Sequence, residues 1–272
     1  MSVQFGVIGG GVMGEALLSR LLARKIYAPE AVVVSDPQPE RRDYLQENYH
    51  VHVTGDNRQA VAASEALLLA VKPQVLDKVV SDLSPHGQGV GGSSLVLSIL
   101  AGVPLKRLEP AFAGQPVIRV MPNTPSIVGA GMTALAPGQG VTEAQRELAK
   151  RIFASVGEVV EVSESLMDAV TGVSGSGPAY VALFIEALAD GGVAAGLPRN
   201  VASQLALQTV LGTAQLLQDS GLHPGQLKDR VTSPGGTTIA GVATLEKLGF
   251  RSATLEAVKA AYQRSQELGR DS

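Results

Sequence analysis

The sequence contains no cysteine and no tryptophan, and phenylalanine and tyrosine together make up only 4% of its 272 residues. Without cysteine the chain has no disulfide, thiolate nucleophile or cysteine metal ligand, and the composition is compatible with a reducing compartment. No apolar run approaches the roughly 20 residues of a membrane-spanning helix. The N-terminus also lacks the basic region and cleavage site of a secretory signal. We therefore expect a cytoplasmic protein.

Charged residues are also few. Only 17% of the residues are charged, the formal net charge is −3, and the chain has no long basic run, so nucleic acid is not an expected partner. The four histidines stand without acidic residues at metal-ligand spacing, and we expect no bound metal. The 45% hydrophobic content predicts a globular protein with a substantial core.

Glycine is abundant, and the first glycine cluster has a recognisable context. A short apolar strand at Phe5–Ile8 runs into G-G-G-V-M-G and then into a helical apolar pattern, which is typical of a Rossmann-type dinucleotide site. In that arrangement one glycine makes the tight turn, the next lets the pyrophosphate approach, and the last allows the helix to pack on the strand. A purely structural glycine turn is the alternative. The cofactor-binding candidates here are Ile8, Gly9, Gly10, Gly11, Val12, Met13 and Gly14.

The second predicted strand, 31–35, ends at Ser35 and Asp36, where such domains read the adenosine ribose. Asp36 would accept a hydrogen bond from a free 2′-hydroxyl and repel a 2′-phosphate, which favours NAD. Ser35, Arg41 and Arg42 would instead attract that phosphate and favour NADP. The residues leave both cofactors open.

Further polar residues follow other predicted strands. Asp56 and Asn57 are expected to cap a helix, Lys72 follows the apolar strand at 66–71, and Ala101 follows the strand at 95–99. Asn123 stands between two prolines after the strand at 117–120, and is expected either to hold the nicotinamide half of the cofactor or to make an Asx turn. Lys72 could equally be a solvated lysine at a strand end.

From about residue 163 the alternating pattern gives way to helices alone. Long helices are predicted at 179–196, 199–219 and 252–268, and too much of their surface is apolar for a lone helical domain to cover. We therefore expect a second chain to pack against them.

An uncharged segment lies among these helices: Val231–Gly241 reads V-T-S-P-G-G-T-T-I-A-G and opens into a predicted helix. Adjacent glycines permit close backbone approach, and the first-turn N–H groups of a helix suit a small anion such as a carboxylate. A simple capped helix start is the alternative. The substrate candidates here are Ser233, Gly235, Gly236, Thr237 and Thr238.

Four stretches together resemble the pyrroline-5-carboxylate reductase family: Ile8–Gly14, Met121–Pro125, Asp168–Tyr180 and His223–Gly241. They occur in family order along nearly the whole chain. The resemblance implies an α/β protein that reduces the C=N bond of 1-pyrroline-5-carboxylate to give proline. It further implies NADPH as the usual cofactor, NADH in some members, and dimers built through interleaved C-terminal helices, often assembled further. Asp36 departs from the Asn-Arg pair that many members carry after the second strand.

Carried over by residue, the resemblance assigns residues 1–163 to an NAD(P)-binding Rossmann domain and 164–272 to an all-helical domain for dimerisation and substrate binding. It places Asn57, Val71 and Lys72 near the cofactor and Glu164 near the substrate, although helix capping is an alternative role for Glu164. Thr238 is implied to hydrogen-bond the ring nitrogen of the substrate and is the catalytic candidate. By the same resemblance, the substrate loop of one subunit faces the dinucleotide domain of its partner.

Other functions remain open at this point. A related imine reductase or a β-hydroxyacid dehydrogenase would share a dinucleotide domain followed by helices, but the latter class typically uses a lysine on a C-terminal helix, and the helices at 179–196 and 199–219 contain none. A non-catalytic NADP-sensing protein would bind cofactor without turnover. A G-x-S-x-G hydrolase is excluded, because neither Ser174 nor Ser176 has glycines at both required spacings.

Overall fold

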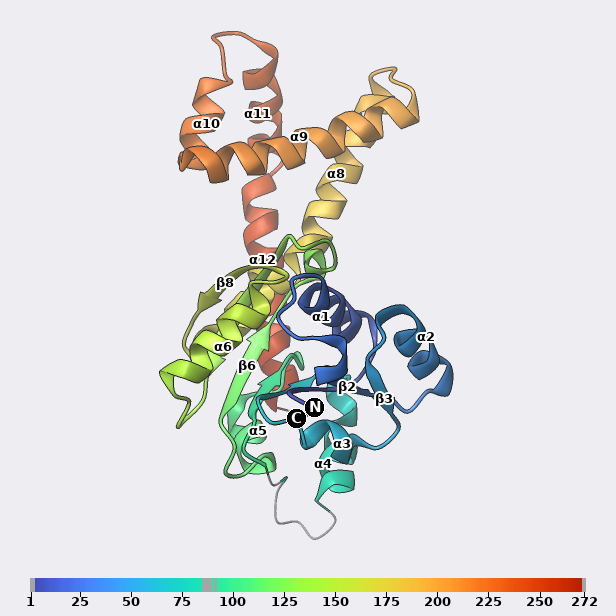
Figure 1. Ribbon diagram of the computed structural model, residues 1–272. Coiled ribbons are helices and arrows are strands. Elements are labelled where there is room, and N and C mark those ends of the chain that lie inside the picture. The colour runs from blue at the N-terminus through green and yellow to red at the C-terminus, as the bar shows by residue number, and fades with distance from the viewer. Residues whose placement is uncertain (1–2, 85–89, 91, 271–272) are drawn as a thin grey trace. The chain divides into compact units, whose positions relative to one another are not determined.

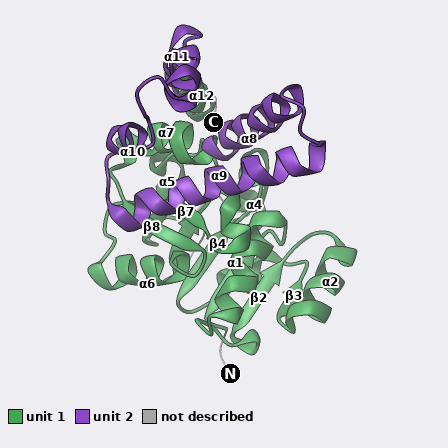
Figure 2. Ribbon diagram, turned by 90° about the horizontal axis from the view of Figure 1, so that it is seen from above, with its two compact units in different colours: residues 1–176, 260–272 green, residues 177–259 purple. Residues whose placement is uncertain are grey.

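The computed structural model describes residues 3–84, 90 and 92–270 (Figure 1). The chain folds as two compact units, which Figure 2 colours separately: Met1–Ser176 with Ala260–Ser272, and Gly177–Lys259. The first unit is an α/β domain, as the sequence predicts, and the second is entirely helical.

An eight-stranded sheet in the order β3-β2-β1-β4-β5-β6-β7-β8 forms the centre of the first unit. All neighbouring strands pair in parallel except β6 and β7, which are antiparallel. This is the doubly wound order of a dinucleotide-binding domain, extended at one edge. The strands are β1 (Phe5–Ile8), β2 (Val32–Ser35), β3 (His52–Thr54), β4 (Ala66–Leu69), β5 (Leu95–Ser98), β6 (Val117–Met121), β7 (Gly131–Pro137) and β8 (Gly157–Glu161).

Helices flank this sheet and also connect its strands. They are α1 (Val12–Ala23), α2 (Pro39–Tyr49), α3 (Asn57–Val61), α4 (Leu76–Leu83), α5 (Leu105–Ala111), α6 (Glu143–Phe153) and α7 (Met167–Val170). Two of them start at side-chain caps: Asp56 accepts from the N–H of Arg58, as predicted, and Thr142 forms a capping box with Gln145.

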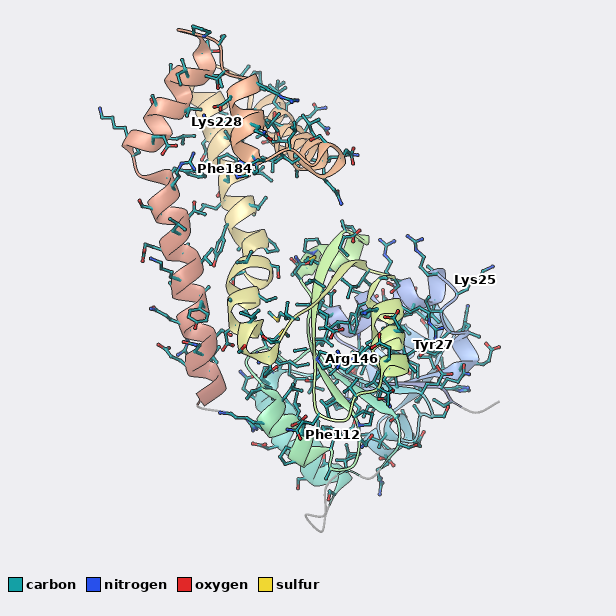
Figure 3. All side chains as sticks on the ribbon, turned by 90° about the vertical axis from the view of Figure 1, so that its left-hand side faces the viewer. Lys25, Tyr27, Phe112, Arg146, Phe184 and Lys228 are labelled. Carbon is teal, nitrogen blue, oxygen red and sulfur yellow. The ribbon has the colours of Figure 1, made fainter. Side chains whose placement is uncertain are left out.

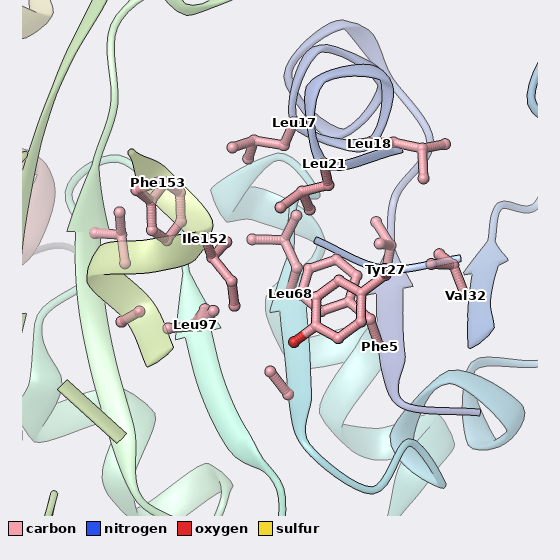
Figure 4. Close-up of a cluster of buried hydrophobic side chains, with 14 of the residues drawn as sticks. Phe5, Leu17, Leu18, Leu21, Tyr27, Val32, Leu68, Leu97, Ile152 and Phe153 are labelled. Carbon is pink, nitrogen blue, oxygen red and sulfur yellow. The ribbon is translucent and has the colours of Figure 1, made fainter. Parts of the chain in front are cut away.

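Alternation along the strands divides the core of the sheet into two layers. Phe5 and Leu68 face one side, where α1 and α6 supply Leu17, Ile152 and other apolar side chains (Figure 4). Ile8, three residues after Phe5, and Leu69, one residue after Leu68, belong instead to the layer formed with α3, α4 and α5. Successive strand residues point to opposite faces, so apolar runs such as Ala66–Leu69 are buried on both sides. The carboxyl ends of β1 and β4 thereby meet at one well-supported edge.

The second unit contains α8 (Gly177–Ala194), α9 (Arg199–Ser220), α10 (Pro224–Arg230), α11 (Thr237–Lys247) and the start of α12 (Phe250–Arg270). Its contacts include a ring pair between Phe184 and Phe250, with centroids 5.7 Å apart (Phe184 is labelled in Figure 3), and a hydrogen bond from the Tyr180 hydroxyl to the Ala257 carbonyl. None of the helices in the described residues has the length and apolar character needed to cross a membrane.

Very little of the second unit is buried within one chain. Its only buried hydrophobic side chains, among the described residues, are Ala189, Ala202 and Ala206, where α8 packs on α9. Leu207 and Leu211 on α9 are 56% and 57% exposed, and most other large apolar side chains of the unit are similarly open. Apolar surface of this extent indicates an interface with another protein chain.

We predict that the chain self-associates and that its melting temperature rises with protein concentration, because association buries the apolar faces of α8, α9 and α11. Sedimentation velocity and thermal unfolding across a hundredfold dilution series measure both properties. A monomer with a constant melting temperature over that range would contradict the inference.

Candidate active site

A cleft of about 560 Å³ lies at the carboxyl edge of the sheet, in the first unit. It is where a parallel sheet of this order accepts a ligand. Eight of the predicted cofactor residues line it: Ile8, Gly9, Gly11, Ser35, Asp36, Asn57, Val71 and Lys72. The sequence therefore identified residues that the fold brings together from four different strand ends.

The glycine loop has the geometry that its spacing predicts. Gly9 adopts φ +103°, which side-chain-bearing residues rarely adopt, and a Cβ on Gly14 would lie 2.2 Å from the Gly9 carbonyl oxygen. A Cβ on Gly11, by contrast, would meet nothing within 4 Å. Two glycines are thus required by the fold, whereas the third leaves open space in the cleft wall at the N-terminus of α1. That space and the N-terminal end of α1 fit the pyrophosphate of a dinucleotide.

The side chain of Asp36 accepts hydrogen bonds from backbone N–H groups through both of its oxygens. Its Oδ2 accepts from the Gly10 N–H at 2.9 Å and its Oδ1 accepts from the Gln38 N–H at 3.0 Å, and the residue is buried. The adjacent Ser35 hydroxyl donates to Asn57 Oδ1 at 2.7 Å. Asp36 therefore joins the end of β2 to the glycine loop, and each of its oxygens already accepts a backbone hydrogen bond.

Arg41 also lines the cleft and is fixed by a polar cluster. Its guanidinium donates to the Gly10 carbonyl and pairs with Glu15, while its Cζ lies 4.9 Å from the centre of the Tyr44 ring. Tyr49 donates to Glu15 at 2.7 Å. Burial alone would raise the pKa of Glu15, but the hydrogen bonds from Arg41 and Tyr49 outweigh it and lower that pKa. Burial, together with the bond to Glu15, raises the pKa of Tyr49 to about 12.

The cations of this cleft outnumber its carboxylates. Arg41, Lys72 and Lys78 line it together with Asp36 and Asp82. Cationic side chains such as Lys72 and Lys78 suit a ligand that carries phosphates. Arg42, the second arginine that the sequence offered for a phosphate, instead donates to the carbonyls of Asp36 and Pro37 and braces the turn after β2.

The other predicted cofactor residues lie outside the lining of this cleft. Gly10, Val12, Met13 and Gly14 continue the glycine loop into α1, and Ala101 is an exposed residue beyond β5. The Asn123 side chain accepts from the Met132 N–H at 2.9 Å and donates to the Ser174 carbonyl at 3.2 Å. It makes no side-chain cap at the helical turn that follows, so the structure gives Asn123 a bracing role that the sequence did not suggest.

Glu164 begins a short 3₁₀ turn, η4 (Glu164–Leu166), after the last strand. Its Oε1 accepts from Arg119 at 2.8 Å and from the Leu105 N–H at 3.0 Å. Sequence reasoning missed Arg119 altogether. A lone cation within the apolar run Val117–Met121 was the available signal, because charged residues are rarely buried without a partner.

The predicted substrate loop belongs to the second unit. It connects α10 to α11 and opens into a helix, as predicted; α11 starts at Thr237, and Gly236 is its N-cap. Gly235 adopts φ +64°, and a Cβ on Gly236 would lie 2.3 Å from the Ser233 hydroxyl oxygen. The chain thus turns sharply into α11, and Thr237 and Thr238 occupy the first turn, where backbone N–H groups lack intrahelical partners.

Metal ligands are not clustered: within residues 3–84, 90 and 92–270, no group of three or more histidine or carboxylate side chains could hold an ion. The cleft is lined by glycine backbone, by the Ser35 hydroxyl and by the cations Arg41, Lys72 and Lys78.

Comparison with known proteins finds two family models along the chain. The family model for pyrroline-5-carboxylate reductase dimerisation matches residues 164–268, and the model for NADP oxidoreductase, coenzyme F420-dependent, matches residues 4–102. A pyrroline-5-carboxylate reductase of Synechocystis is 64% identical, over 99% of this chain and 100% of its own. The chain belongs to the pyrroline-5-carboxylate reductase family.

Solved members of the pyrroline-5-carboxylate reductase family share the whole fold. The Plasmodium falciparum enzyme, determined with NADP bound, has a TM-score of 0.86 and 33% identity, and the match covers 98% of each chain. The Coxiella burnetii enzyme has a TM-score of 0.87 and 36% identity, also over 98% of each chain. The predicted fold class is confirmed, and the dimerisation model accounts for the open apolar surface of the helices.

We predict that Glu15→Gln destabilises the protein at pH 7, because it breaks the pair with Arg41. Since the pKa of Glu15 is lowered by folding, its contribution to stability is present above the unfolded pKa and is lost as the pH falls through the folded pKa. Thermal unfolding of both proteins from pH 7 to about pH 3 should show the two melting temperatures converging. Glu47→Gln, on exposed α2, is the control, and a pH-independent difference for Glu15→Gln would contradict the assignment.

Proposed function

We propose that this chain reduces the C=N bond of 1-pyrroline-5-carboxylate to give L-proline, with NADPH as the usual cofactor and NADH as an alternative. The observation that carries the proposal is the uncharged loop that opens α11, in a chain whose other unit has a dinucleotide cleft and whose family carries this activity. We also keep the assignment of residues 1–163 to the cofactor and 164–272 to dimerisation and substrate, which the dimerisation match from residue 164 supports.

The cleft would hold the cofactor through its glycine loop and cations. The N–H groups at the start of α1 would face the pyrophosphate, Lys72 and Arg41 would offer positive charge, and Asn57, Ser35 and Asp36 would support the ribose end; Lys72, Arg41, Asn57, Ser35 and Asp36 all line the cleft. Val71 would flank the ring system, and Ala101 and Asn123, after β5 and β6, would lie toward the nicotinamide half. The bound cofactor supplies the hydride.

The loop would hold the substrate. The backbone N–H groups of Gly235–Thr238 and the Ser233 hydroxyl suit a carboxylate, and Thr238 would hydrogen-bond the ring nitrogen. These donors are uncharged, which matters because the protonated imine is a cation and a lysine or arginine beside it would oppose its charge. Such an iminium accepts hydride readily, so the protein has to position the substrate more than to act as a strong acid.

The two halves of the site belong to different units, and we propose that they meet between subunits. In this arrangement the loop of one chain completes the cleft of its partner, as the family resemblance implies. Dimerisation would then be a condition for activity as well as for stability. We further propose that the enzyme works in the reducing cytoplasm, with which its cysteine-free sequence is compatible.

Purified protein should oxidise NADPH when pyrroline-5-carboxylate is added, with one proline formed for each NADPH consumed. Absorbance at the nicotinamide band measures the NADPH consumed, and amino-acid analysis measures the proline formed. The same assay with NADH gives the cofactor preference. Tight dinucleotide binding without turnover would instead favour the sensor alternative and refute the proposed reaction.

We predict that Thr238→Ala lowers kcat by about 10- to 100-fold, because a hydrogen bond to the reacting nitrogen is lost. The Kd for NADPH should not change. Thr244→Ala is the matched control, since Thr244 lies on the same helix and its hydroxyl donates only to the Ala240 carbonyl at 3.0 Å. Unchanged turnover in Thr238→Ala would remove the assigned role.

A further inference from the structure

Arg119 is a buried cation in the middle of β6. Its side chain is 5% exposed, and it is the only lysine or arginine in the buried class among the described residues. A charge in such a place is costly unless it is paired and hydrogen-bonded. The groups that pair with the Arg119 guanidinium therefore indicate the role of this residue.

Two carboxylates from the start of the helical region face this guanidinium. Arg119 lies 2.8 Å from Glu164 Oε1 and 3.6 Å from Asp168 Oδ1, and that Asp168 oxygen also accepts from the Ser265 hydroxyl of α12 at 2.8 Å. The Leu105 N–H, at the start of α5, adds a second donor to Glu164 Oε1. One arginine thus ties β6 to residues from three other segments of the first unit.

The hydrogen bonds of Glu164 are divided unequally between its oxygens. Oε1 accepts from both Arg119 and the Leu105 N–H, whereas Oε2 is buried and has no hydrogen-bond partner within the described part of the chain. Buried carboxylate oxygens are normally paired. The cluster of two carboxylates and one guanidinium also carries one net negative charge.

We propose that Arg119 is a positioning residue: it fixes Glu164 by one oxygen and thereby keeps Oε2 as an acceptor, and the cluster's net negative charge, for the cationic ring of the substrate. The inference rests on the proposed function, in which Glu164 belongs to the substrate site. Arg119 itself contacts neither substrate nor cofactor in this scheme and acts only through Glu164.

A second arginine of the same unit provides a matched control. Arg146 on α6 also bridges two carboxylates, Glu143 and Glu161, but its side chain is 34% exposed. Arg146 is labelled in Figure 3. Arg146→Met removes the same kind of pairing without touching Glu164.

The test compares R119M, E164Q, the double variant and R146M in the intact protein. We expect R119M to raise the KM for pyrroline-5-carboxylate about tenfold while the Kd for NADPH stays unchanged. E164Q should have a similar effect, and the double variant should be no worse than either single one, because the two residues act as one unit. R119K should restore part of the loss, and R146M should behave as the wild type.

Additive effects of R119M and E164Q on KM, or an unchanged KM in R119M, would overturn the inference. So would an equal loss of NADPH affinity, which would indicate a general structural role. If R119M does not fold, R119K and E164Q carry the test, and an unchanged substrate KM in both would refute the proposal. Absence of turnover in the wild-type protein is a separate result and would refute the proposed function itself.

Discussion

The helical unit leaves most of its apolar surface unburied within one chain, and this constraint drives association with a second chain. Between Gly177 and Lys259 only three small alanines are buried hydrophobic residues, so α8 and α9 have almost no core of their own. Burial of apolar area is the main favourable term in folding. The match to the dimerisation family model indicates that a second chain covers these apolar helix faces.

The dinucleotide unit, by contrast, has a hydrophobic core of its own. Polar side chains hold the backbone of its glycine loop in place. Asp36 and Arg41 both contact Gly10, one through its N–H and the other through its carbonyl. Contacts of this kind fix the backbone of the glycine loop in place, which lowers the ordering cost of binding a ligand. Asp36 and Arg41, which the sequence suggests as cofactor-binding residues, therefore also stabilise the conformation of the glycine loop.

Much of the fold and of the site could be predicted from the sequence, because local rules determine them. The G-x-G-x-x-G spacing, the apolar strands and the glycine turn before α11 each express backbone geometry, and all of them are found where expected. Short helices such as α4 and α10 were not predicted, since they have too few turns to show a period. The roles of Asn123 and Arg119 depend on partners 51 and 45 residues away, which no local pattern encodes.

The most direct test of this account asks whether the loop of one subunit completes the cleft of its partner. Gly11→Asp places a carboxylate in the open space of the cleft, and Gly236→Val forces the loop away from Ser233. Heterodimers of the two variants, co-expressed with different tags and purified, should recover about half of the wild-type activity although each parent is inactive, because one intact loop then meets one intact cleft. Heterodimers as inactive as their parents, yet folded and associated, would contradict the account.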